Sequence, residues 1–87
     1  MSMSRELTGM IINSQRNIDD QIAKLRGYLS EIETTMSTVS EVLGADDDYG
    51  KKMNDQLAQT KKTVEDAIGT LANAKEKLSQ VGLVGRR

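Results

Sequence analysis

The sequence predicts an all-α protein: an antiparallel two-helix hairpin, coiled-coil-like, that assembles into a four-helix bundle. In two long stretches, apolar residues recur at alternating intervals of three and four residues, which is the spacing of a coiled coil. Turn-forming residues separate the two stretches near the middle of the chain. Proline, the strongest breaker of helices, is absent from the 87 residues. This length fits one small domain covering residues 1–87.

The first helix is expected over residues 4–43. Its seam, meaning the positions that face the other helix, consists of Ile18, Ile22, Leu25, Leu29, Ile32, Met36, Val39 and Leu43. The spacing continues backward through Gln15 to Ile11 and then blurs, because Leu7 stands one place before the expected position, Thr8. One long helix therefore accounts for the first half of the chain.

The central stretch reads LGADDDYG, and residues 44–50 are expected to form the loop. Gly44 follows the last seam residue of the first helix, where the residue that ends a helix is commonly a glycine in the left-handed conformation. Three aspartates at 46–48 come next, and carboxylates there can cap free N–H groups at the start of a second helix. Tyr49 is expected to pack over the tip. Such a short connection makes the two helices antiparallel neighbours.

The second helix is expected over residues 51–81. Its seam consists of Met53, Leu57, Thr60, Val64, Ala67, Leu71, Ala74, Leu78 and Val81. Residues 82–87 break the heptad spacing and are expected to form a flexible tail. Neither half of the chain alternates with the period of two that a strand requires.

The two seams can pair in registers that differ by whole heptads. A very tight bend would set Met36 opposite Met53. A wider loop would set Leu43 opposite Met53 and Val39 opposite Leu57.

Charged residues beside the seams favour the wider loop. In that register Glu33 comes near Lys61 and Asp19 comes near Lys75, whereas the tight bend brings Arg26 toward Lys61. Each exposed pair contributes only about a few tenths of a kcal/mol, so the charges select the register without adding much stability.

Six residues outside the seam are candidates for partner binding: Ile12, Tyr28, Val42, Ile68, Gly27 and Gly69. The four apolar residues either widen the buried stripe of a lone hairpin, as is common in small bundles, or become buried against further helices. The two glycines fall at the outermost heptad position. They are either tolerated surface variation or a smooth patch where another helix approaches closely.

The composition argues against several functional classes. Histidine and cysteine are absent, so an activated nucleophile, a disulfide and a thiolate metal site are not expected. The aspartates lack the spacing of an EF-hand loop, whose late glutamate would fall on Leu57. A net charge of -1 and the lack of interleaved aromatic residues argue against nucleic acid. No apolar run approaches the roughly 18 residues of a membrane span. We expect a protein that is not an enzyme, has no cofactor and does not insert into a membrane.

The layout resembles the WXG superfamily of type VII secretion. It comprises slightly under a hundred residues, no recognisable cleavable signal, and two long amphipathic helices joined by a loop with an aromatic residue and a glycine. It is most similar to the small helical-hairpin proteins that accompany LXG toxins and help to direct them to the secretion machine. The family's Trp-x-Gly tripeptide would fall on Asp48, Tyr49 and Gly50, which keep the glycine and lack the tryptophan. The family's C-terminal Tyr-x-x-x-acid signal is absent after Leu78.

The resemblance implies a helical adaptor or co-secreted partner, working as a homodimer or heterodimer. Its partner would be a homologous hairpin, including a second copy, or the helical targeting domain of a larger exported toxin. The missing signature favours an accessory role over self-directed secretion. The implied location is the bacterial cytoplasm, with export by the type VII route. The alternative is a structural coiled-coil assembly or scaffold protein of a phage or a multiprotein complex.

Overall fold

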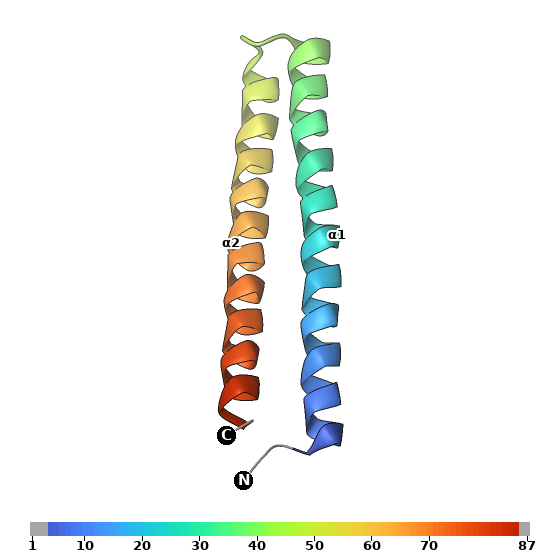
Figure 1. Cartoon of the computed structure of the whole chain (residues 1–87). Coiled ribbons are helices and arrows are strands. Elements are labelled where there is room, and N and C mark those ends of the chain that lie inside the picture. The colour runs from blue at the N-terminus through green and yellow to red at the C-terminus, as the bar shows by residue number, and fades with distance from the viewer. Residues whose placement is uncertain (1–3, 86–87) are drawn as a thin grey trace.

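The computed structural model describes residues 4–85, which form two long α-helices joined by a short loop. Helix α1 spans Arg5–Leu43 and helix α2 spans Asp48–Gly85. The two helices run antiparallel and lie side by side along their whole length (Figure 1). The molecule is a rod measuring 64 × 14 × 11 Å. The predicted antiparallel two-helix hairpin is confirmed.

Side chains and backbone groups cap α1 at both ends. The Ser4 hydroxyl accepts a hydrogen bond from the Leu7 backbone N–H at 3.1 Å, so Ser4 is the N-cap. At the other end, the Gly44 N–H donates to the Ser40 carbonyl oxygen at 2.9 Å. Gly44 has φ 88° and ψ 150°. The expected left-handed conformation is therefore wrong: φ is positive, but this ψ places Gly44 in an extended region that essentially only glycine occupies.

The loop is shorter than expected, because α2 begins at Asp48 and leaves only residues 44–47 between the helices. The Asp47 carboxylate accepts a hydrogen bond from the Gly50 N–H at 2.7 Å, and the Asp47 carbonyl oxygen accepts one from the Lys51 N–H at 2.9 Å. Asp47 is therefore the N-cap of α2. Our assignment of residues 48–50 to the loop was wrong, because they form the first turn of the helix that Asp47 caps.

Helix α2 also continues past the expected end at residue 81 and reaches Gly85. Residues 82–85, expected in a tail, are therefore helical. The break in the heptad spacing changes which positions could face α1, but no proline or capping residue there stops the backbone hydrogen bonds. The rest of the expected tail, residues 86–87, lies outside the described residues.

The register is the one that the flanking charges favoured. Lys61 Nζ lies 3.1 Å from a carboxylate oxygen of Glu33, and Lys75 Nζ lies 2.8 Å from a carboxylate oxygen of Asp19. In this register the first turn of α2 packs against the end of α1: Gly50 is buried, and a Cβ there would make an ordinary van der Waals contact with the Leu43 Cβ at 3.4 Å.

The core is a single line of side chains. The buried hydrophobic residues among those described are Ile32, Val39 and Val64, and even the best covered, Ile32, keeps 3% of its surface exposed. The other seam residues are half-buried, and the last one of each helix, Leu43 and Val81, is exposed. Two helices thus cover a seam from two sides only, as expected for a chain too small to enclose a core.

Candidate interaction surface

The seam is flanked by two faces of different character. Heptad geometry places one flanking position of each helix on each side of the seam, and in an antiparallel pair like positions meet. The hydrogen bonds and ion pairs between α1 and α2 show on which side of the seam each row lies. The first row, the bridged face, comprises Ile12, Asp19, Arg26, Glu33 and Ser40 of α1 with Asn54, Lys61, Ile68 and Lys75 of α2. The opposite row, the open face, comprises Leu7, Ser14, Gln21, Tyr28, Thr35 and Val42 of α1 with Tyr49, Gln56, Thr63, Thr70 and Lys77 of α2.

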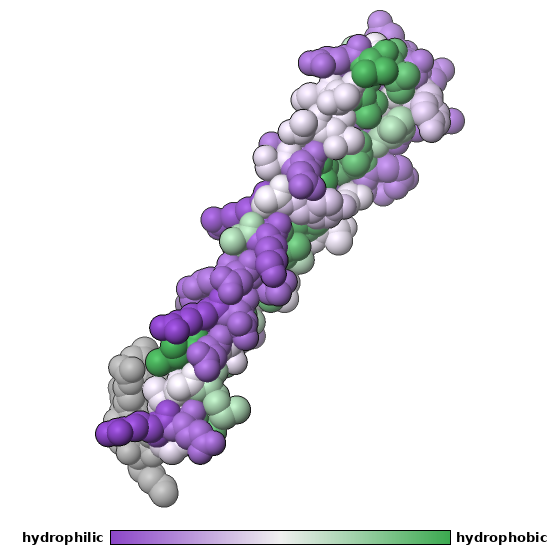
Figure 2. Space-filling model, turned by 90° about the vertical axis from the view of Figure 1, so that its right-hand side faces the viewer, coloured by the Kyte–Doolittle hydropathy of each residue, from purple (hydrophilic) through white to green (hydrophobic). Residues whose placement is uncertain are grey.

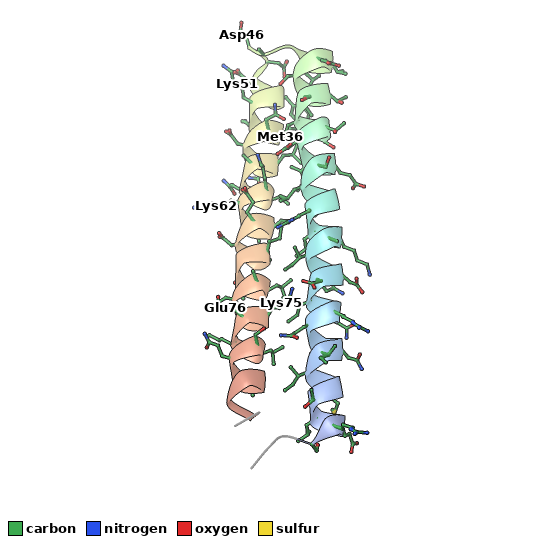
Figure 3. All side chains as sticks on the ribbon, viewed as in Figure 1. Met36, Asp46, Lys51, Lys62, Lys75 and Glu76 are labelled. Atoms are coloured by element: carbon green, nitrogen blue, oxygen red, sulfur yellow. The ribbon has the colours of Figure 1, made fainter. Side chains whose placement is uncertain are left out.

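The bridged face is closed by polar contacts between α1 and α2. Besides the two ion pairs, the Asn54 amide donates to the Ser40 hydroxyl at 3.1 Å. Next to this row, the Gln15 amide donates to the Ser79 hydroxyl at 2.7 Å. Figure 3 shows Lys75 reaching toward α1, whereas Lys62 projects from α2 away from it. In residues 4–85, the cross-helix side-chain bonds all lie on this side of the seam.

The open face carries exposed apolar side chains and a single charged residue, Lys77. Val42 is 73% exposed, Tyr49 67% and Leu7 53%, and Tyr28 is also exposed. In Figure 2, hydrophobic surface gathers toward the loop end of the hairpin, and hydrophilic surface dominates its middle. Of the two rows, the open face therefore carries most of the exposed large apolar side chains, whereas the bridged row has one, Ile12.

The threonine hydroxyls of the open face already donate hydrogen bonds within their own helices. The Thr35 hydroxyl donates to the Glu31 carbonyl oxygen at 2.8 Å, the Thr63 hydroxyl to that of Gln59 at 3.1 Å, and the Thr70 hydroxyl to that of Asp66 at 3.0 Å. Each hydroxyl thus already donates to the carbonyl four residues earlier in its own helix. Covering these residues would leave no hydroxyl donor without an acceptor, which lowers the cost of burying them.

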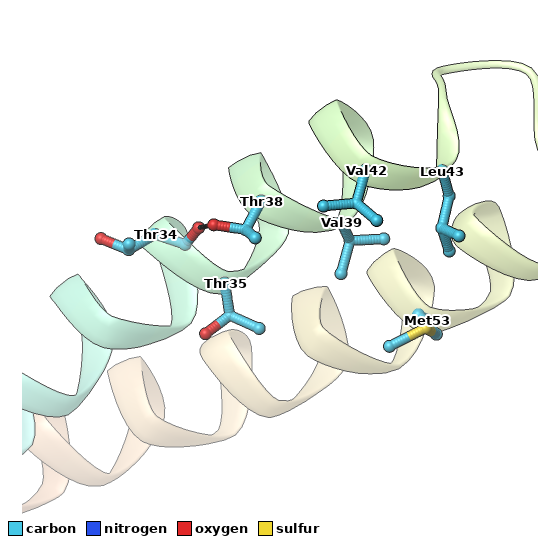
Figure 4. A pocket seen from close by; sticks show the side chains of 7 residues that line it. All are labelled: Thr34, Thr35, Thr38, Val39, Val42, Leu43 and Met53. Carbon is cyan, nitrogen blue, oxygen red and sulfur yellow. Dashed lines mark hydrogen bonds between the residues drawn. The ribbon is translucent and has the colours of Figure 1, made fainter.

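Shallow grooves mark both ends of the open face. At the loop end, a groove of about 350 Å³ is lined by Thr34, Thr35, Thr38, Val39, Val42, Leu43 and Met53 (Figure 4). A neighbouring groove of about 390 Å³ shares Thr35 and Met53 with it and continues along α2 to Leu57. At the end where the termini lie, a groove of about 360 Å³ is lined by Leu7, Met10, Ile11, Ser14 and Val81. Depressions of this kind could receive apolar side chains from another helix.

The six residues predicted to bind a partner do not form one surface. Tyr28 and Val42 lie on the open face and are exposed. Ile12 is exposed and Ile68 half-buried, and both fall in the bridged row on the other side of the seam. The heptad pattern alone groups these residues together, because both positions beside a seam are adjacent to it, although they lie on opposite sides.

The two helical glycines face outward. Gly27 and Gly69 are exposed, and a Cβ added at either would meet nothing within 4 Å. Each lies at the outermost position of its own helix, so the two do not share a patch.

The four predicted loop residues have distinct places. Gly44 ends α1, Asp48 begins α2 and Gly50 is buried against Leu43. Tyr49 does not pack over the tip as expected. It stands at an open-face position in the first turn of α2, where two thirds of its surface is exposed.

Leu7, Met10 and Tyr49 also belong to the exposed apolar surface and were not predicted as part of it. A signal for this surface was nevertheless present. Of the two flanking rows, one contains five charged residues and the other contains one, Lys77. This difference in charge is enough to tell the two faces apart from the heptad positions alone.

Within residues 4–85, no group of three or more acidic, histidine or cysteine side chains is placed to hold a metal ion. In the same part of the chain, neither helix is long and apolar enough to cross a membrane.

Comparisons with family models, curated proteins and solved structures found no match to this chain. A functional interpretation therefore depends on the geometry of the two faces and on the resemblance in layout.

Proposed function

We propose that this protein is a non-enzymatic helical adaptor or co-secreted partner in type VII secretion, which acts by packing side by side against another helical protein. The partner is a homologous hairpin or the helical targeting domain of an exported toxin. The observation that supports this most directly is the half-covered seam beside a face with exposed Tyr28, Val42 and Tyr49.

The surface area of the chain supports the need for a partner. A compact monomer of 9.6 kDa has an accessible surface of about 5,100 Å². This chain exposes 6671 Å². The difference, about 1,600 Å² per chain, is about twice the roughly 800 Å² that one partner contributes to a protein interface of standard size. Packing against further helices would bring the chain nearer to the coverage of an ordinary globular protein.

The layout supports the link to type VII secretion. Two helices of 39 and 38 residues joined by a short turn match the architecture that the resemblance implies. On this proposal the protein is present in the bacterial cytoplasm and leaves the cell together with its partner, because the tripeptide at residues 48–50 lacks the tryptophan of the family signature.

A secretion experiment tests this role. In the bacterium that encodes the protein, deleting its gene should reduce the amount of LXG toxin in the culture medium, and inactivating the type VII ATPase should have the same effect. Restoring the gene should restore export. Toxin export that is unchanged by the deletion would contradict the adaptor role.

A biophysical experiment tests the association step. Sedimentation equilibrium and helical circular dichroism should be measured on the purified chain over one dilution series. A helical assembly that loses helicity on dilution, or a weakly helical monomer that gains helicity with the toxin's helical domain, is expected. A monomer that stays fully helical at every dilution and ignores that domain would contradict the proposal.

A structural coiled-coil role is the second candidate, and the 64 Å length of the rod favours it. In a phage or a multiprotein complex such a rod would set the distance between its neighbours. The identity of the neighbouring genes separates the two roles, because a toxin or secretion ATPase supports the first and virion genes support the second.

A further inference from the structure

We propose that the loop end of the open face binds a free fatty acid, a carboxylate with a straight apolar chain of about ten to twelve carbons, and that Lys52 holds the carboxylate. This inference goes beyond the proposed function and does not depend on it, because it concerns the chain by itself and a small molecule.

The site is formed by the two grooves at the loop end. Both are lined by Thr35 and Met53, so they adjoin and form one loop-end channel between α1 and α2. Figure 4 shows Val39 and Leu43 of α1 directed toward α2, which carries Met53. Leu57 extends the channel along α2. An apolar chain in this channel would cover seam residues that the two helices leave partly in water.

The length of the channel matches a chain of about twelve carbons. Its lining residues on α1 run from Thr34 to Leu43, which lie nine positions apart. At 1.5 Å per residue this distance is about 13 Å. An extended chain advances about 3.5 Å for every three bonds, so about eleven bonds fit the channel.

The three threonines that line the channel present no free hydroxyl donor. The Thr34 hydroxyl donates to the Ser30 carbonyl oxygen at 3.1 Å, and the Thr38 hydroxyl donates to that of Thr34 at 2.9 Å. The Thr35 hydroxyl donates to the Glu31 carbonyl oxygen at 2.8 Å. An apolar chain can therefore cover these side chains without leaving a donor unsatisfied.

The charges near the channel determine which way the fatty acid lies. Lys52 is the one charged residue among the described lining residues, and it is exposed. In the described part of the chain, no carboxylate lies within ion-pair distance of it, so its ammonium group is free to bind an anion. At the far end, Glu31 lies one helical turn before Thr35 and would repel a carboxylate. The carboxylate therefore lies at the loop end, and the apolar chain extends toward Glu31.

The groove at the other end of the rod provides a comparison within the same molecule. It is lined by Leu7, Met10, Ile11, Ser14 and Val81, and none of these residues is charged. A fatty acid would find similar apolar contacts there without a cation for its carboxylate. We therefore expect the loop-end channel to bind it more tightly.

Methionine methyl groups report where the ligand binds, because Met53 lines the loop-end channel and Met10 lines the groove at the other end. The full chain, with 13C-labelled methionine methyl groups, should be titrated with decanoate below its micelle concentration. Met53→Leu and Met10→Leu identify the two signals. The Met53 signal should shift and saturate, while the Met10 signal stays in place.

The expected affinity sets the range of this titration. A ligand of about twelve non-hydrogen atoms should bind a shallow site with a dissociation constant of the order of 1 mM. No saturable shift of Met53 up to about 10 mM decanoate would overturn the inference. Equal shifts of Met53 and Met10 would also overturn it, because they would show non-specific binding to exposed apolar side chains.

A series of chain lengths tests the fit to the channel. Burying one methylene group completely tightens binding about fourfold, so one that is half-covered should contribute about twofold. Laurate should thus bind about 16-fold more tightly than octanoate. Myristate should gain less than about twofold over laurate, because its last carbons pass the end of the channel. A gain that continues undiminished to myristate would contradict the site.

Charge reversal tests the role of Lys52. Lys52→Glu should weaken decanoate binding about fivefold, because one exposed attractive contact becomes repulsive. Lys51→Glu is the matched control, since Lys51 is also exposed but does not line the channel, and it should leave the affinity unchanged. Decyltrimethylammonium, which has the same chain and a cationic head group, should instead bind Lys52→Glu more tightly than the unchanged chain. Equal decanoate affinities for the two lysine variants would contradict the inference and leave the toxin-export test of the proposed function unaffected.

Discussion

Replacing Gly44 by alanine should strongly destabilise the hairpin. A Cβ at Gly44 would meet nothing within 4 Å, so crowding does not contribute. The cost comes from the backbone, because φ 88° and ψ 150° lie in a region that essentially only glycine occupies. Residues held in such regions cost of the order of 1–3 kcal/mol, so we expect a loss of about 2 kcal/mol in the free energy of unfolding.

Gly27 and Gly69 provide matched controls for the same chemical change. Both lie inside helices, lack the positive φ of Gly44, and have open space where a Cβ would go. Alanine at either position should stabilise the hairpin by up to about 1 kcal/mol, because glycine is the weaker helix former. Identical substitutions should therefore change stability in opposite directions.

Urea unfolding followed by helical circular dichroism measures both effects. With a slope of about 1.5 kcal/mol per M, Gly44→Ala should lower the midpoint by about 1.3 M, and each control should raise it by about 0.7 M. The chain concentration must be held fixed, because self-association adds to apparent stability. An unchanged or raised midpoint for Gly44→Ala would refute the backbone argument. If Gly27→Ala weakened dimerisation, the result would instead support the hypothesis that another helix approaches closely at this glycine.

Three further substitutions probe capping, the core and a buried polar atom. Asp47→Ala should lower the free energy of unfolding by about 1 kcal/mol, because the Gly50 N–H loses its cap. The control, Asp46→Ala, should leave urea unfolding nearly unchanged. Ile32→Ala should cost about 3 kcal/mol by removing the best-covered side chain, and a loss below about 1 kcal/mol would mean that the seam is not the core. Asn54→Leu should raise the thermal midpoint, with a gain of about 1 kcal/mol, because the buried Asn54 Oδ1 accepts no hydrogen bond in the described part of the chain. A lowered midpoint for this variant would show that water or a partner satisfies that oxygen.

The sequence was sufficient to predict the hairpin and its register. Coiled-coil spacing places Ile32 and Val64 in the seam directly, and both are buried. The charges of Glu33 and Lys61 could select the register because their side chains are long enough to meet across the seam. Both inferences depend only on position along a helix, which the heptad spacing determines.

The loop could not be predicted to the residue. Any of the three consecutive aspartates can cap a helix, and the choice of Asp47 follows from where the chain turns after Gly44. Starting α2 at Asp48 then places Gly50 against Leu43 and leaves Tyr49 in water. Because Asp47 is the capping residue and α2 starts at Asp48, not at residue 51 as expected, every residue of that first turn has a different environment from the predicted one.

The candidate surface was predicted in part. Exposure of Tyr28 and Val42 followed from their positions beside the seam, and the structure agrees. The separation of the two faces did not follow from hydrophobicity alone, because Ile12 and Ile68 are equally apolar. It emerged from the polar contacts that close one side of the seam, such as that between Asp19 and Lys75.

The position of the three buried residues also determines the order in which the hairpin opens. Ile32, Val39 and Val64 lie in the half of the rod nearer to the loop, where short stretches of chain connect the paired residues. Closing a short stretch costs little entropy, so these contacts can form first and persist longest. Pairing of the two helices should therefore start beside the loop, residues 44–47, and proceed toward the termini. Amide hydrogens should exchange fastest at the terminal end of the rod. The loop end is then the part that stays paired longest, and the terminal end is the part that opens first.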